Sequence, residues 1–192
     1  DSFGFMWGIG GSFSVGEEQQ HSLSYGYGFT DAKGNNNSSD TTADDTNSIS
    51  HSYTLGHDFT LNDLISTSIG LGYADSDAND DTNDYETYDL SFRVNLAFPW
   101  AYVSIGDALS WNDYKRVDTS TNSGLLRSDV VNTFDFTFSK ALGDFLPFID
   151  RSKSIIMNFY YEKSISESNI ITNDYISDSF SIGLTKSIHL NK

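Results

Sequence analysis

Residues 86–98 read ETYDLSFRVNLAF and decide the fold class. Apolar or aromatic side chains occupy every second position from Tyr88 to Phe98, and polar or small ones lie between them, from Asp89 to Ala97. A period of two places the two sets on opposite faces of a β-strand. A helix would instead repeat its apolar residues every three or four positions. This stretch therefore predicts one long strand with an apolar face and a polar face.

The same alternation continues along the rest of the chain. No segment has a convincing helical period, so we predict an all-β chain of about nine or ten strands, longer than the common five or six residues. The other alternating segments are residues 3–15, 23–30, 49–59, 65–73, 103–111, 130–138, 155–161 and 180–184.

The joins between these segments differ in length. Short joins are expected near Gly16–Gln20, Thr60–Asp63 and Pro99–Trp100, with a medium one at Ala141–Ser152. Long polar joins, several of them acidic, are expected at Asp31–Asn47, Asp75–Asp84, Asp113–Arg127 and Glu167–Asp174. Short turns on one rim and long acidic loops on the other predict an antiparallel up-and-down meander, which is also the asymmetry of transmembrane barrels.

Composition excludes several classes of protein. The 192 residues carry a net charge of −16, which disfavours binding to nucleic acid because a phosphate backbone needs a basic surface. The 14 Phe, 11 Tyr and 3 Trp residues argue against disorder, and the absence of Cys excludes disulfide scaffolds and thiolate metal sites. The longest apolar run, Leu96–Val103, is too short for a membrane-spanning helix. We expect residues 1–192 to form a single domain.

Two architectures produce such strands: a soluble sandwich with its apolar face inside, and a membrane barrel with its apolar face outside. The face opposite the aromatic residues is mostly Gly, Ser, Ala and Thr, which suits the inside of a closing sheet better than a solvated exterior. Aromatic residues also gather near the expected strand ends, as in the two girdles of a barrel in a bilayer. Those assigned to the long-loop rim are Tyr73, Tyr88, Trp111, Tyr161 and Tyr175, and those assigned to the short-turn rim are Phe59, Phe98 and Trp100.

In this pattern the sequence resembles the bacterial outer-membrane β-barrel class over nearly its whole length. The resemblance implies a location in the bacterial outer membrane, with membrane lipid as a partner. The stretch from Tyr160 to Ile170, followed by Asn173-Asp-Tyr and Phe180-Ser-Ile-Gly-Leu, looks like the final hairpins of export-type barrels. Such barrels usually end on an aromatic residue, whereas this chain ends Ile188-His-Leu-Asn-Lys. Either Leu190 takes that role, or the chain is trimmed or unusual.

The polar positions of the strands supply the candidate functional residues. In a barrel they point into the lumen, where charges either pair as a structural network or control selectivity and gating. The candidates are Asp89, Arg93, Asn95, Asp135 and Glu162. Arg93 is the basic residue among them, so it is expected to need a carboxylate partner.

Asp107 and Lys186 fall on the apolar positions instead. A charge facing lipid at mid-depth is costly, so we expect a β-bulge at Gly106–Asp107 or an interfacial position for these residues.

Other chemistry has weaker support. Asp75, Asp77, Asp80 and Asp81 in the acidic 75–84 loop could bind calcium weakly through hard oxygen ligands, although the loop lacks an EF-hand pattern, and no other cofactor is expected. The histidines are His21, His51, His57 and His189; His51 and His57 lie too far apart on one strand to share a metal ion, and interfacial positions are expected. No Gly-x-Ser-x-Gly motif occurs, so a membrane-barrel lipase or protease is a minor alternative.

The sequence therefore predicts a non-enzymatic outer-membrane barrel, acting as a passive pore or as the membrane module of a transport or export assembly. The alternative is a secreted β-sandwich structural or filament subunit. An odd strand count conflicts with the even number of bacterial barrels. We therefore expect a strand upstream of Asp1, in which case the chain is the C-terminal part of a longer one. Pairing of the first strand with another protomer, or a miscount within Ala141–Ser152, would also resolve the conflict.

Overall fold

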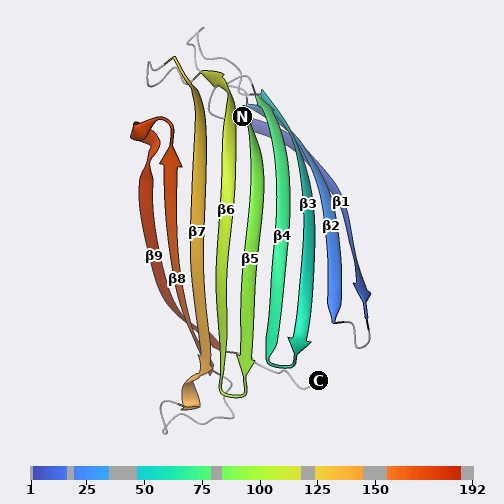
Figure 1. The fold of residues 1–192 in the computed structure, drawn as a ribbon, viewed down its shortest axis with the longest axis vertical. Helices are drawn as coiled ribbons and strands as arrows, with labels where there is room; N and C mark the ends of the chain where they lie inside the picture. The colour runs from blue at the N-terminus through green and yellow to red at the C-terminus, as the bar shows by residue number, and fades with distance from the viewer. Residues whose placement is uncertain are drawn as a thin grey trace.

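The strands that the structure describes form a single antiparallel sheet, as drawn in Figure 1. The computed structural model describes residues 2–16, 20–34, 47–78, 84–117, 124–144 and 155–186. The described strands follow one another in chain order across the sheet. They are β1 (Ser2–Val15), β2 (His21–Gly34), β3 (Asn47–Asn62), β4 (Ile65–Ala78), β5 (Tyr85–Phe98), β6 (Ala101–Val117), β7 (Leu126–Ala141), β8 (Ile155–Ser168) and β9 (Tyr175–Lys186). The predicted all-β, up-and-down meander is confirmed.

Helical structure in the described ranges is limited to two short 3₁₀ turns, η2 (Leu142–Asp144) and η4 (Ile171–Asn173). No helix in this part of the chain is long and apolar enough to cross a membrane.

The short turns lie where the sequence predicts them. Gly16 follows β1 with a φ of 100°, a left-handed conformation that favours glycine. Between β3 and β4, the Asn62 side chain accepts hydrogen bonds from the backbone N–H groups of Leu64 and Ile65, both at 2.9 Å. Pro99 and Trp100 alone connect β5 to β6. Each tight turn fixes the register of the hairpin that it closes.

The pairing of the strands is continuous, with irregularities at only two described positions. The register shifts between Thr60 and Asn62 and between Asp113 and Val117. The bulge expected at Gly106–Asp107 is absent: Gly106 pairs with Asp135 and Asp107 with Phe134 without a shift. That expectation is wrong because regular pairing of β6 with β5 and β7 continues through Asp107, leaving its side chain on the apolar face.

The strand ends are staggered across the sheet. A cross-strand line follows directly paired residues from one strand to the next. The line that starts at Val15, the last residue of β1, reaches Phe180 in β9, and β9 then continues to Lys186. At the opposite end, the line through Gly10 reaches Tyr175, the first residue of β9. This stagger of about six to eight residues corresponds to a strand tilt of about 30° if the sheet curls into a cylinder.

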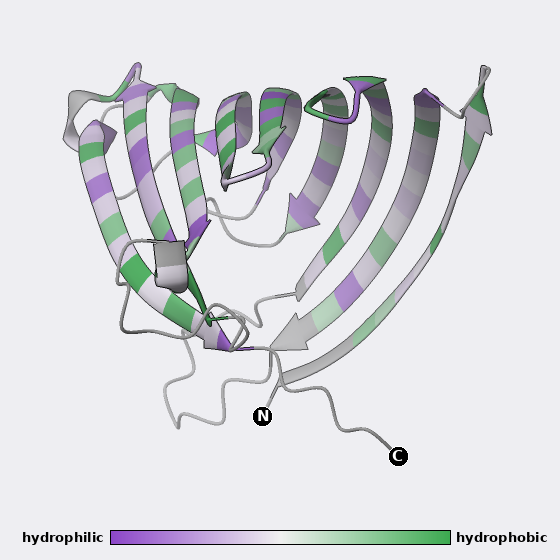
Figure 2. Cartoon of the chain, turned by 90° about the horizontal axis from the view of Figure 1, so that it is seen from below, coloured by the Kyte–Doolittle hydropathy of each residue, from purple (hydrophilic) through white to green (hydrophobic). Residues whose placement is uncertain are grey.

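The sheet is curved and twisted but open (Figure 2). Among the described strands, β1 pairs only with β2 and β9 only with β8, so the two edges do not meet. Because neighbouring strands alternate in direction and nine strands lie in order, β1 and β9 run in the same direction. A closed barrel is therefore not observed.

The two faces of the sheet differ sharply in chemistry. We call the face of Leu90 and Phe92 the apolar face and the face of Asp89 and Arg93 the polar face. The alternation is visible as stripes along the strands in Figure 2. Large apolar side chains remain exposed: Phe92 is 47% exposed and Phe180 60%. The only buried apolar side chains in the described part of the chain are Ala78, Ala101 and Ile170, so the apolar face has no cover within it.

Candidate functional site: a charged network on the polar face

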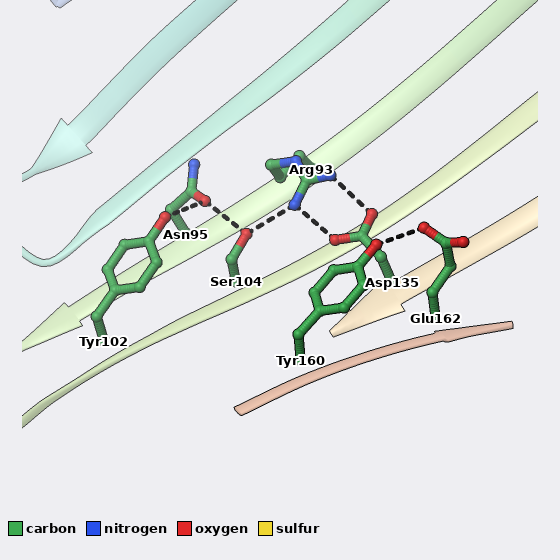
Figure 3. A network of polar contacts seen from close by, with 7 residues as sticks. All are labelled: Arg93, Asn95, Tyr102, Ser104, Asp135, Tyr160 and Glu162. Atoms are coloured by element: carbon green, nitrogen blue, oxygen red, sulfur yellow. Dashed lines mark hydrogen bonds and ion pairs between the residues drawn. The ribbon is translucent and has the colours of Figure 1, made fainter. Parts of the chain in front are cut away.

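An ion pair between Arg93 on β5 and Asp135 on β7 lies at the centre of the polar face, as Figure 3 shows. Arg93 donates two parallel hydrogen bonds, from Nη1 to Oδ1 and from Nη2 to Oδ2 of Asp135, both 2.7 Å long. Bidentate pairing of this kind is the strongest common geometry for a guanidinium and a carboxylate. The Asp135 side chain is 13% exposed and that of Arg93 41%. Arg93 therefore has the carboxylate partner expected from the sequence.

Gly106 allows this pair to form across an intervening strand. It lies on β6 and pairs directly with Arg93 on one side and Asp135 on the other. A Cβ atom at this position would collide with Asp135 Oδ2 and lie 2.7 Å from Arg93 Nη2. The absent side chain is therefore what lets the guanidinium lie flat over β6.

Three polar groups extend the network towards the short-turn rim. Arg93 Nη1 donates to the Ser104 hydroxyl at 3.0 Å, and Ser104 donates to Asn95 Oδ1 at 2.8 Å. Tyr102 also donates to Asn95 Oδ1, at 2.8 Å. Sequence patterning had not singled out Ser104 and Tyr102, although their even positions on β6 place them on the polar face.

Glu162 and Asp89 lie on the same face but outside this network. Tyr160 donates a hydrogen bond to Glu162, which pairs with Asp135 across β7 and β8. Asp89 accepts a hydrogen bond of 2.6 Å from the Ser110 hydroxyl. The structure thus brings Arg93, Asn95 and Asp135 together, keeps Glu162 beside them and leaves Asp89 separate.

The middle of the polar face carries an excess of negative charge. Arg93 and Asp135 neutralise each other, whereas Asp58, Asp89 and Glu162 have no ion pair among the described residues. Asp58 pairs with Ser22 and Ser68, both neutral. A solute on this face would therefore experience a net negative field.

The apolar face carries a continuous line of aromatic side chains. Direct cross-strand pairs link these residues in the order Tyr27, Tyr53, Tyr73, Tyr88 and Trp111. The ring centroids of Tyr73 and Tyr88 are 5.1 Å apart. Beyond this line, towards the long loops, the same face becomes charged at Asp75, Glu86 and Asp113, which also pair in a line.

The other aromatic residues assigned to the rims do not belong to this line. Phe98 and Trp100 stack at the short-turn rim with centroids 5.5 Å apart, and Phe59 lies near the same rim. One rim assignment is wrong, and a second residue lies at the expected rim but on the other face. Tyr161 lies in the middle of β8, paired with Phe136 and Phe180, because β8 continues past it to Ser168. Tyr175 is on the polar face, because its partner Ser166 shares that face with Glu162.

Two of the four acidic residues proposed for calcium lie in a strand. Asp75 and Asp77 belong to β4, and Asp75 pairs with Lys115 at 2.6 Å, whereas Asp80 and Asp81 lie outside the described residues. No cluster of three metal-ligating side chains occurs in the ranges the structure describes. Burial lowers the pKa of Lys115, but the hydrogen bond and charge of Asp75, with the charge of Asp84, outweigh it and raise the pKa above its usual value. Lys115 thus remains a cation beside Asp75.

The histidines form an unexpected pair on the apolar face. His21 Nδ1 and His57 Nε2 lie 3.1 Å apart, within hydrogen-bond distance, whereas His51 bonds the Tyr27 hydroxyl at 2.8 Å. His189 lies outside the described residues. The long loop between β2 and β3 hides this pair from sequence reasoning, because it leaves their register open.

No family model matches the sequence, and no curated protein shows significant similarity to it. The function of the chain must therefore be inferred from the chemistry of its two faces.

Removing the arginine of the central pair tests the network. Arg93→Ala leaves the Asp135 carboxylate without its cation, and we expect a loss of about 1–2 kcal/mol in the free energy of unfolding, between the values for exposed and buried pairs. In a conducting protein, ion selectivity should also shift towards cations. Denaturant titration and reversal potentials measure the two effects. Unchanged stability together with unchanged selectivity would remove Arg93 from the functional site.

Proposed function

We propose that this sheet is the wall of an outer-membrane β-barrel that forms a passive pore, with its apolar face against lipid and its polar face lining the lumen. The observation that carries the proposal is the uncovered apolar face. Exposed apolar patches of this extent mark an interaction surface, and a face this regular fits lipid chains.

The height of the apolar face supports a membrane location. From Tyr88 to Phe98, β5 presents only apolar or aromatic side chains on this face. At about 3.3 Å per residue these positions cover about 33 Å of strand, or about 28 Å of depth at a tilt of about 30°. Outer-membrane barrels have an apolar band of about 25 Å bordered by aromatic girdles. Glu86, the next residue of this face towards the long loops, is charged.

The polar face fits a water-filled lumen. Its glycine and hydroxyl side chains are small, which allows the sheet to curl towards this side. In a lumen, charged groups such as Asp58 and Glu162 remain in contact with water, whereas against lipid they would lose their hydration. Three charged residues on one cross-strand row are exceptions, because Asp107, Lys163 and Asp178 lie on the apolar face. There the Asp107 carboxylate accepts a hydrogen bond of 3.2 Å from Asn132, and Asp178 accepts one of 2.7 Å from Tyr161.

Closure of the barrel requires further polypeptide. In a bilayer, every backbone N–H and C=O group must be hydrogen-bonded within protein, so the edges of β1 and β9 must find partners. These two strands run in the same direction. An odd number of additional antiparallel strands between them restores an even total and completes the ladder. Such strands, supplied by this polypeptide or a protein partner, are part of the proposal.

Detergent dependence and conductance test the proposed function. The whole polypeptide should stay monodisperse in detergent micelles, aggregate when detergent is removed, and produce stepwise currents in a planar lipid bilayer. A monodisperse protein in plain buffer at high concentration would overturn the membrane location and favour a secreted structural subunit. Membrane insertion without any current would overturn the open pore and favour a plugged module of an export assembly.

A further inference from the structure

The polar face is divided into two unlike halves. The network, with its large side chains Arg93 and Tyr102, and the neighbouring Tyr160–Glu162 hydrogen bond together extend over β5 to β8 (Figure 3). The half formed by β2 to β5 contains an open groove of about 300 Å³ instead. Its lining residues are Ser24, Thr54, Leu55, Gly56, Gly70, Leu71, Gly72, Asp89 and Ser91. The groove therefore runs beside the network and not through it.

Glycine residues keep the floor of this groove flat. Each of three lining glycines pairs directly with a polar residue on the next strand: Gly56 with Ser24, Gly70 with Ser91, and Gly72 with Asp89. A Cβ at Gly70 would lie only 2.6 Å from the Ser91 hydroxyl, and one at Gly72 2.9 Å from Asp89 Oδ2. The polar side chains thus lie across the neighbouring strand instead of projecting into the groove. Their oxygen atoms line the groove, which extends across β2 to β5 over two neighbouring cross-strand rows of the polar face.

The negative charge that lines this groove favours cations. Asp89 is the sole charged residue that lines the groove, and its described partner is the neutral Ser110 hydroxyl. Arg93, the nearest base along β5, is held by Asp135 across β6. The remaining lining residues are glycine, two leucines and three hydroxyl residues, and the hydroxyl oxygens can replace part of the water around a small cation. A fixed carboxylate in a confined aqueous groove concentrates cations and repels anions.

We propose that the path of small cations through the lumen passes this groove and that Asp89 determines the charge selectivity of the path. The inference rests on the proposed pore, because it assigns the path and the charge preference within the lumen. The Arg93–Asp135 pair then acts as a neutral wall of the path, and Asp89 is the group that a passing ion meets.

Bilayer conductance of the full protein tests the charge preference. With a KCl gradient across the bilayer, the wild type should prefer K⁺, and Asp89→Asn should lower the K⁺/Cl⁻ permeability ratio several-fold while single-channel currents persist. Glu86→Gln is the matched control, since it removes the same charge from the same strand but on the apolar face. An unchanged ratio in Asp89→Asn would overturn the inference while leaving the pore intact.

Thiol labelling tests the path itself, and the lack of native cysteine makes a single introduced one unambiguous. In Ser91→Cys in lipid vesicles, a cationic methanethiosulfonate should react about tenfold faster than an anionic one of similar size. Addition of Asp89→Asn should remove most of this difference. Equal rates for the two reagents in a conducting Ser91→Cys protein would overturn the inference. Absence of both labelling and current would instead overturn the pore on which it rests.

Discussion

Replacement of Phe92 by arginine is expected to lower the free energy of unfolding in a lipid bilayer by about 2–4 kcal/mol. Phe92 lies near the middle of β5 on the apolar face and is 47% exposed. Its cross-strand neighbours are Ile69 and Asp107. If this face contacts lipid, the guanidinium is placed near the bilayer midplane, where no water solvates it and the Asp107 carboxylate opposite offsets part of the cost. The cost arises from the position of the side chain and not from a lost internal contact.

The same substitution one residue earlier serves as the control. Ser91 is on the polar face of the same strand, so the arginine of Ser91→Arg would enter the lumen and stay hydrated. We expect Ser91→Arg to change the free energy by less than about 1 kcal/mol. Urea titrations of both variants refolded into lipid vesicles give the two values. Equal tolerance at positions 91 and 92 would show that the faces are assigned the wrong way round.

Sequence alone predicted the faces of the residues within the alternating segments, because the period of two needs no knowledge of pairing. Arg93, Asn95 and Asp135 were placed on one face in this way, and they lie there together. The register of β5 on β6 also follows from sequence, since the two-residue turn at Pro99–Trp100 fixes the pairing of Arg93 with Gly106.

Pairing across long loops could not be predicted. Whether Arg93 meets Asp135 or Glu162 depends on the register of β6 on β7, and these strands are joined by the loop between Val117 and Leu126. A shift of the register by two residues keeps the same faces but changes every partner. The His21–His57 contact was missed for the same reason. A long loop is compatible with several registers of the strands that it joins, and the packing of the sheet determines which register forms.

Strand ends were also misjudged from sequence. β6 continues to Val117 and β2 to Gly34, well into stretches that were assigned to loops. Beyond the aromatic line both faces become polar, so the alternation disappears although the backbone pairing continues. Tyr161 was misplaced because β8 continues to Ser168, seven residues beyond it. Tyr175 begins β9 at the expected rim, but its side chain is on the polar face.

Gly106→Ala is expected to cost about 2–3 kcal/mol of stability, although it adds only one methyl group. The new Cβ would occupy the space where Arg93 Nη2 and Asp135 Oδ2 meet, with Arg93 Cζ only 2.9 Å away. The two charged side chains can rotate away, but only by breaking both hydrogen bonds of the pair. The substitution therefore combines overpacking with two separated charges on a partly buried surface, which outweighs the usual gain from reducing glycine flexibility.

A double-mutant cycle identifies the cause of that loss. In Arg93→Ala the guanidinium is gone and Asp135 can turn aside, so the further cost of Gly106→Ala should fall to within about 0.5 kcal/mol of zero. Gly183→Ala is the control, because Gly183 is also on the polar face and a Cβ there would meet nothing within 4 Å. It should be neutral or slightly stabilising. If Gly106→Ala costs the same with and without Arg93, backbone strain in β6 explains the loss and the glycine has no role in seating the ion pair.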